Sequence, residues 1–500
     1  MKLFVLLIHL NIERREEYCR SRNFPKVRRN MLRDIIKKEI IEGITSAKFV
    51  FTFLLCSILI LLSVYTGITN YRGEQKEYDT AVALNKKNME SQPNFPALAS
   101  LGTKINKPPQ VLSTIASGVS EAVGRVAKVG SSADPSLVDS KYESNPAYSV
   151  FGALDMTFIV KIVLSLFAIL FTYNTIAGEK EMGTLKLTLS NCVPRDRLIL
   201  GKGIGGLISL LIPLIIPMIL SLIILLVYPH VNLSGQDWGR LMFMFLLFLL
   251  YVSVFFSLGL FVSARTHKSS TSFLLLLFIW VVFVTIIPKL SVLVAAQIKP
   301  IPSIHEITAK KDAFLVQILF EEQKATMNHW EKIEKSGQTE KEFFEQYKKW
   351  AEKNHQEYMD KTNSYNASLE RDYQVKKRAQ EQLAVNLSRI SPASALMIGS
   401  MNLARTGPEE HARFLASVRI FKPIFTEWIN AKMYRALNVN KQTLDMGSKP
   451  NLDDMPQHKF EPESLAKSLS RILPDFGLML FLIIFFFVGA YVSFIKYDVR

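Results

Sequence analysis

The segment GEKEMGTLKLTLSNCVPRDRLILGK, from Gly178 to Lys202, lies between two long apolar stretches of the chain. Five basic and three acidic residues fall among its twenty-five positions. Charged side chains are costly inside a bilayer, so a charged segment between two apolar ones is typical of a loop that joins two membrane helices. The sequence therefore predicts a membrane protein with spans on both sides of this loop.

Composition indicates how many spans to expect. Of the 500 residues, 49% are hydrophobic, and they occur in blocks, as in membrane proteins. A helix needs roughly 20 apolar residues to cross a hydrocarbon core of about 30 Å, and it bonds its own backbone in lipid. The predicted fold class is an all-α polytopic membrane protein with six transmembrane helices and a large, mainly helical extracytoplasmic domain. The six predicted spans are 49–69, 156–176, 205–228, 241–263, 271–295 and 475–495.

Lys and Arg residues near the span ends predict the orientation. Residues 11–48 contain eleven of them, which places the N-terminus in the cytoplasm. Alternation puts three more segments inside: 178–204, 264–270 and 495–500. Three segments fall outside: 70–153, 229–240 and 297–474. We expect a multi-pass protein of the cell inner (cytoplasmic) membrane with both termini cytoplasmic. The net charge of +16 then reflects topology and contact with anionic lipid rather than nucleic-acid binding.

The N-terminal region contains two candidate starts. Residues 1–30 open with a short apolar run that lacks a small-residue cleavage site, which argues against a signal peptide. We hypothesise that Met31 is the true initiator and that 1–30 is a non-native extension, with Met1 as the alternative. Apolar residues then recur at helical spacing over 31–48, with charges between them. This pattern predicts a cytoplasmic interfacial helix, or a helix that merely leads into the first span.

The two long outer segments differ in how much they reveal. No fold is assigned to 70–153, where KPPQ and GSSADP signal turns. Within 297–474, the stretch 321–385 predicts two antiparallel helices broken near Ser336–Thr339, the second as long as about 45 residues, or about 68 Å. Ser391 and Pro392 have the pattern of a cap and first residue of another helix. That helix ends at Gly407-Pro408, and a further one runs to about Leu437. The cysteines Cys19, Cys56 and Cys192 lie outside both segments, so neither is held by disulfides.

Several sequence features suggest chemistry that the chain does not support. LSGQ at 233–236 resembles the signature loop of ABC ATPases, but no phosphate-binding G-x-x-x-x-G-K-[ST] occurs in the chain. The eight histidines are dispersed without ligand spacing, and Met397 with Met401 is better explained as a packed helix face than as a soft-metal site. No catalytic constellation can be singled out. The sequence therefore predicts no catalytic residue, no metal site and no cofactor in this chain.

The opening segment has an ordered pattern of its own. Its first part, Glu181 to Leu189, is amphipathic, and Pro194, Arg195 and Arg197 follow before Gly201 and Lys202 lead into the third span. A helix on the membrane surface here would present carboxylates and apolar residues to a partner. An ordinary solvated inner loop is the alternative that the residues alone leave open.

This pattern resembles the segment between the second and third spans of ABC-2 type transporter permeases. There E-x-x-x-G-T-L, P-x-x-R and L-x-G-K recur, carried here by Glu179, Gly183, Thr184, Leu185, Pro194, Arg197, Leu200, Gly201 and Lys202. The six spans and the helix before the first also match. The large insertion before the last span, including 391–415, is similar to the insertion found in one subgroup of these permeases. The nitrous-oxide-reductase maturation and gliding-motility permeases are relatives of that kind.

The resemblance implies a mechanism. Two permease copies, in a homo- or heterodimer, each dock on a separate ABC ATPase subunit that binds ATP and Mg²⁺. Docking occurs through a coupling helix at about Glu179–Ser190, with 32–46 packed alongside. The implied docking residues are Glu179, Glu181, Gly183, Thr184, Leu185, Arg195, Arg197 and Lys202. Gly183 would permit either a close backbone approach or a turn.

Three residues within the spans are candidates for a translocation path. Lys161 lies about five residues inside the second span, where a cation is a functional candidate or extends toward the outer face. Pro213 and Pro217 should kink the third span, as a hinge or as a static bend.

The sequence thus favours a permease subunit of an exporter, without enzymatic activity of its own. One alternative is an ATP-driven mechanotransmission device that acts on a cell-envelope protein without moving a substrate. The other is a membrane sensor or scaffold.

Overall fold

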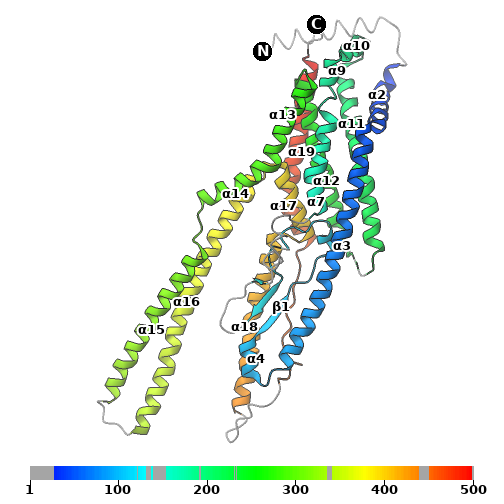
Figure 1. The fold of residues 1–500 in the computed structure, drawn as a ribbon. Coiled ribbons are helices and arrows are strands. Elements are labelled where there is room, and N and C mark those ends of the chain that lie inside the picture. The colour runs from blue at the N-terminus through cyan, green and yellow to red at the C-terminus, as the bar shows by residue number, and fades with distance from the viewer. Residues whose placement is uncertain are drawn as a thin grey trace. The chain divides into compact units, whose positions relative to one another are not determined.

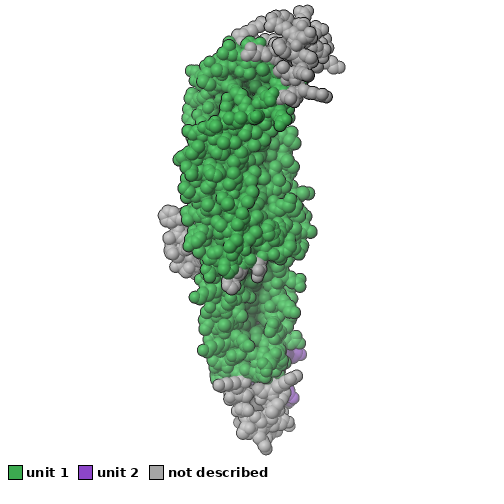
Figure 2. Space-filling model, turned by 90° about the vertical axis from the view of Figure 1, so that its right-hand side faces the viewer, with its two compact units in different colours: residues 1–285, 391–500 green, residues 286–390 purple. Residues whose placement is uncertain are grey.

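The computed structural model describes residues 27–120, 122–130, 137–138, 154–190, 193–229, 231, 233–334, 340–438 and 450–497. It is mainly helical and forms two units (Figures 1 and 2). Unit 1 comprises Met1–Thr285 with Ser391–Arg500, and unit 2 comprises Ile286–Ile390. The division falls inside the fifth candidate span.

Six helices in the described part of the chain are long and apolar enough to cross a membrane. This confirms the predicted fold class, and the chain is a multi-pass membrane protein. The helices extend beyond the predicted spans, because their charged and polar ends are also helical. The candidate spans are Ala47–Glu90, Met156–Glu181, Arg195–Val227, Gly235–Arg265, Ser269–Ile298 and Leu465–Ile495.

The bundle of unit 1 is organised around the fourth span. This helix, α12 (Gly235–Arg265), is the most buried of the six, and its aromatic residues Phe248, Tyr251 and Phe255 lie fully inside the core. Its residues 251–260 are all buried, which explains why this half of the helix is apolar around nearly its whole circumference. The other helices of the spans and of the segments between them are α2 (Val27–Thr45), α3 (Ala47–Glu90), α7 (Met156–Ile159), η2 (Val160–Leu164), α8 (Ser165–Thr172), α9 (Ala177–Glu181), α10 (Thr184–Ser190), α11 (Arg195–Val227), α13 (Ser269–Val281), η3 (Val282–Ile286) and α19 (Leu465–Ile495).

The first outer segment has a fold that its sequence did not reveal. After α3 come α4 (Phe95–Leu101), β1 (Thr103–Asn106), η1 (Val111–Thr114), β2 (Val126–Val129) and β3 (Leu137–Val138). The strands form an antiparallel sheet in the order β1-β2-β3, with Thr103 opposite Val129 and Val126 opposite Val138. One apolar cluster joins Val129 of this sheet to Phe414 and Phe421 of α18 (Pro408–Asn438). The outer part of unit 1 is therefore built from segments about 300 residues apart in the chain.

The helix predicted to begin at Ser391 packs against the membrane helices. It is α17 (Pro392–Ala404), and the Ser391 hydroxyl accepts from the Ala393 and Ser394 amides, as the predicted cap requires. Arg405 ends it in the left-handed conformation. Its residues Ala395 and Leu396 belong to the same buried cluster as Leu247 and Phe248 of α12. The predicted single outer domain, 297–474, is thus divided: 297–390 lies in unit 2, and 391–474 lies in unit 1.

Unit 2 contains the predicted helix pair. It comprises α14 (Ile287–Ile298), α15 (Ile304–Glu334) and α16 (Glu340–Ser388), the last with 49 residues. Phe314 stacks on Tyr365 and His329 on Trp350, both with ring centroids 3.9 Å apart. Because residue numbers rise along α15 while those of their partners fall along α16, the two helices are antiparallel, as predicted. The predicted break near 336–339 lies outside the described residues.

Candidate functional site

The charged loop folds as a short two-helix segment at one end of the unit 1 bundle. We call Ala177–Ser190, which contains α9 and α10, the α9–α10 segment. It lies at the end of the bundle where α2 and the last turn of α19 also lie (Figure 1). The sheet and α18 lie at the opposite end of unit 1.

Gly183 makes the turn between the two short helices. Its φ of +76° lies in the left-handed region, which side chains other than glycine adopt at a cost. A Cβ at this position would meet nothing within 4 Å. The turn, one of the two predicted reasons for a glycine here, is confirmed, and the close approach of a partner stays a prediction.

The short helix α10 has two distinct faces. Leu185 and Leu189 are buried in a cluster with Leu198 of α11 and Phe494 of α19. Met182, at the turn, is 72% exposed, and Leu187 is 67% exposed. Thr184 is also exposed. Two large apolar side chains thus face away from the bundle beside the charged residue Glu181.

A buried ion cluster holds this end of the bundle together. The ammonium group of Lys202, on α11, lies 2.7 Å from Glu179 Oε1 on α9 and 2.9 Å from Glu39 Oε1 on α2. Lys202 is only 3% exposed, and its charge is neutralised within the chain by these two carboxylates. A Cβ at Gly205 would lie 2.7 Å from Glu39 Cβ, which shows how closely α2 approaches α11. Glu39 was not singled out from the sequence, since nothing local to α2 indicates which distant cation it meets.

Further polar contacts fix α9 to the fourth and fifth spans. Lys180 donates to the carbonyls of Ala264 and Thr266 at the end of α12. Glu181 accepts from the Ser269 amide, at 2.9 Å, at the start of α13. The Ser263 hydroxyl accepts from the amides of Ile176 and Ala177, both at 3.0 Å.

Arg195 connects the start of the third span with the end of the sixth. Its guanidinium donates to the carbonyls of Ile495 and Tyr497, at 2.6 and 2.8 Å. Arg197 lies in the same turn and is partly buried. All eight implied docking residues therefore gather at this end of the bundle, but Lys202 and Leu185 face inward.

The three residues predicted for a translocation path lie elsewhere, within the spans. Lys161 belongs to the π-helical turn η2, and its ammonium lies 3.4 Å from Met397 Sδ on α17. π-helical turns often mark functional positions. Pro213 and Pro217 are buried in α11, which continues as one helix through both. The predicted kink stays a prediction.

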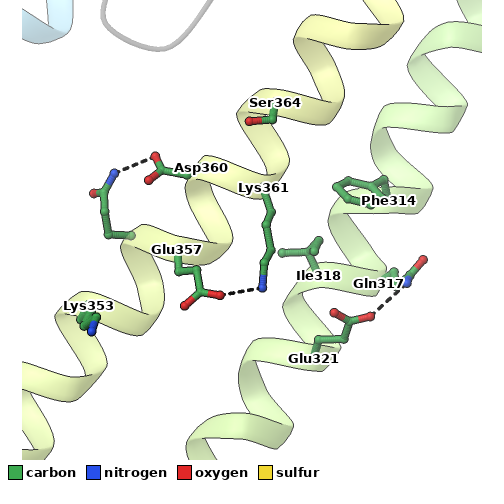
Figure 3. A pocket seen from close by; sticks show the side chains of 10 residues that line it. Phe314, Gln317, Ile318, Glu321, Lys353, Glu357, Asp360, Lys361 and Ser364 are labelled. Atoms are coloured by element: carbon green, nitrogen blue, oxygen red, sulfur yellow. Dashed lines mark hydrogen bonds and ion pairs between the residues drawn. The ribbon is translucent and has the colours of Figure 1, made fainter.

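Unit 2 carries a separate groove between α15 and α16 (Figure 3). It has a volume of roughly 860 Å³ and is lined by Phe314 and Ile318 together with charged residues. Two of its charges form a local pair, Glu357 with Lys361 at 2.9 Å. In the described residues, no group of three or more His, Cys, Asp or Glu side chains is suited to a metal ion.

Comparison with protein families gives one match. Residues 33–499 match the family described as ABC-2 family transporter protein. The matched range contains all six candidate spans and the whole α9–α10 segment. Among curated proteins there is no match.

Proposed function

This chain belongs to the ABC-2 family of transporter proteins, and we propose that it is the permease subunit of an exporter driven by a separate ATPase. Family members are membrane components and are not themselves catalytic. In this proposal the ATPase supplies the ATP and Mg²⁺ sites, and the permease works as a homo- or heterodimer in the inner membrane. Both termini and the α9–α10 segment then face the cytoplasm.

The observation that carries the proposal is the two-faced α9–α10 segment. Met182 and Leu187 expose apolar surface that no part of unit 1 covers among the described residues. Such a patch rimmed by polar side chains is typical of a protein contact. Glu181 and Thr184 border it and would contact basic or polar groups of the ATPase. Glu179, Leu185 and Lys202 would contribute indirectly, by holding the segment in position.

The contacts beneath the segment support transmission of movement to the spans. Lys202 links α9 to α11 and α2, while Lys180 and Glu181 link α9 to α12 and α13. Leu185 and Leu189 pack against α11 and α19. A closing motion of the ATPase that displaced α10 would therefore act on five of the six candidate spans, on the second through α9 and on the other four through these contacts.

The test is co-purification of the ATPase with the full-length protein from its native membranes. The variant Met182→Asp with Leu187→Asp should lose at least about tenfold of the co-purified ATPase, because a contact centre of this kind contributes roughly 2 kcal/mol or more. Val82→Asp with Leu84→Asp is the matched control, since these residues are also exposed and apolar but lie at the far end of α3. Equal retention in both variants would exclude this segment as the docking site.

A second candidate, mechanotransmission to a cell-envelope protein, is favoured by the length of α3. Its residues Cys56 and Ile60 belong to the core of the bundle, whereas Met89 belongs to the core formed with the outer sheet and α18. One helix of 44 residues is thus shared by both cores. If ATP moves the spans, adding ATP to the purified complex without substrate should change the fluorescence of an environment-sensitive label attached at Leu84→Cys. Unchanged fluorescence would argue against this candidate.

A further inference from the structure

Helix α15 of unit 2 is apolar on two faces, and α16 covers only one of them. On the covered face, Phe314 stacks on Tyr365 of α16 and Ile318 is buried. Figure 3 shows both Phe314 and Ile318 on the side of α15 that faces the groove toward α16. This packing accounts for one apolar face of the helix.

The second face carries large apolar side chains that are more than half exposed. Val316 is 53% exposed, Leu319 52%, Phe320 68% and Met327 60%. Single exposed apolar residues are ordinary, but four on one side of one helix form a patch that indicates a binding surface. Each of them lies within unit 2, beyond the fifth candidate span.

The spacing of this face is that of a coiled-coil seam. Steps of four and three residues alternate from the first member to the last, so the positions recur at the heptad spacing. We call these residues the α15 seam: Ala309, Ala313, Val316, Phe320, Gln323 and Met327. A seam of this width fits one facing helix, whereas a helix lying in a membrane surface has a broader apolar face.

Gln323 at the middle of the seam indicates what the facing helix is. A side-chain amide has both donors and an acceptor, so two copies of it can bond to each other across a two-fold axis. A polar residue at such a core position sets register and partner choice in coiled coils. Facing any apolar residue instead, the Gln323 amide would be left without a partner, at a cost of about 1–3 kcal/mol.

We propose that the α15 seam binds the same seam of a second copy of this chain, as a parallel and in-register helix pair. In a parallel pair each seam position faces its own counterpart, so the two Gln323 amides meet, whereas an antiparallel pair sets Gln323 against an apolar position such as Phe320 or Met327. The flanking positions are then compatible. Asp312 of one copy faces Gln317 of the other, Leu319 faces the stem of Lys324, and Thr326 faces Glu331, so like charges do not meet.

The pair would join the two permease copies at a place distant in sequence from the α9–α10 segment. It rests on the dimer of the proposed function and specifies a contact surface for it, but it depends on neither the ATPase nor a substrate. Its failure and the failure of ATPase docking are therefore separate results.

The test is disulfide trapping in the full-length protein, in native membranes, after Cys19, Cys56 and Cys192 are replaced by Ser. Single substitutions Val316→Cys, Phe320→Cys, Gln323→Cys and Met327→Cys should each give a disulfide-linked dimer under mild oxidation, lost on reduction. Glu321→Cys and Asn328→Cys are the controls, since both residues are exposed but lie on another face of α15. We expect at least fivefold more dimer at the seam positions than at the controls.

Each other pattern overturns the proposal. Dimer at Gln323→Cys alone would indicate antiparallel helices that cross at that point. Equal trapping at seam and control positions would indicate random collision, and linkage to a different protein would show that another partner covers the seam. As a second measurement, Gln323→Glu places two like charges opposite each other and should reduce trapping at Phe320→Cys, whereas Glu321→Gln should not.

Discussion

Lys202 and its two carboxylates show how one buried residue organises the proposed docking end. The ammonium lies within 2.9 Å of both Glu39 and Glu179, and these three residues come from α2, α9 and α11. Burying charges is costly, but removing one member of a satisfied cluster costs more, because the others stay buried without a counterion. The cluster therefore fixes the positions of α2, α9 and α11 relative to one another.

Replacing Lys202 should consequently destabilise the protein. We expect Lys202→Met to reduce the free energy of unfolding by about 3 kcal/mol, since both carboxylates lose their counterion. Thermal unfolding of the detergent-solubilised protein, followed by intrinsic fluorescence, measures the effect. Lys186→Met is the control because Lys186 is exposed on α10. Equal melting temperatures for the two variants would contradict a stabilising role for the cluster.

His411 of α18 provides a prediction on pH. It is buried, and neither ring nitrogen has a hydrogen-bond partner in the described part of the chain. Burial, with the nearby charges of Lys107 and Arg125, lowers the pKa of His411 to about 3. The imidazole of the unfolded chain binds a proton near pH 6.5, and that of the folded protein does not. Stability from this residue is therefore complete above about pH 6.5 and is lost as the pH falls toward 3.

The measurement compares melting temperatures at pH 7.5 and pH 5. Between these pH values the free energy of unfolding should fall further for the wild-type protein than for His411→Leu, by about 1–2 kcal/mol, and its melting temperature should fall further as well. Burial also raises the pKa of the neighbouring Glu410 carboxyl, but this group is present in both proteins. The difference between them therefore reports on His411, and parallel pH profiles would refute the assignment.

At the scale of elements, the fourth span connects the bundle with the outer part of unit 1. Arg240, near the start of α12, is fully buried. Its guanidinium donates to the Leu403 carbonyl at the end of α17 and to Ser468 at the start of α19, at 3.2 and 3.0 Å. One side chain thus joins three helices where they approach the outer sheet and α18.

We expect Arg240→Ala to reduce the free energy of unfolding by about 3 kcal/mol or more, because it leaves buried acceptors without a donor and creates a cavity. Arg240→Met should recover the part of this lost free energy that is due to packing, but not the part that is due to hydrogen bonds. The same fluorescence-detected melting measures both. Arg265→Ala, at the other, exposed end of α12, is the control, and a loss of equal size there would show that Arg240 has no special role.

At the scale of the whole molecule, the two ends of unit 1 are joined by the long helix α3. The α9–α10 segment contacts α11, α12, α13 and α19 at one end. At the other end, α3 and α18 enclose the outer core with the sheet. Because α3 belongs to both cores, any rotation of this helix would be transmitted directly to the sheet. This holds whether the protein moves a substrate or only passes the movement to a partner.

Much of this arrangement was predictable because it depends on short-range properties of the chain. Six apolar runs predicted six span-length helices, and the spacing of aromatic residues in 321–385 predicted the antiparallel pair. Ser391 and Pro392 marked the start of α17, since capping is decided within one turn. Gly183 was recognised as a turn candidate because only glycine adopts such a φ without cost. The sequence alone determined these elements.

Only the tertiary structure decided which of these residues meet. Glu39 and Lys202 are 163 positions apart in the chain, and no local periodicity pairs them. The apolar pattern of α17 is equally compatible with an outer domain and with its observed packing against α12. The strands of 103–138 are two to four residues long, and their apolar core is completed by α18 together with residues of α3 and α4. Burial of an ion pair, a short helix or a short strand depends on surfaces supplied by distant segments, and that is why periodicity within each segment could not reveal it.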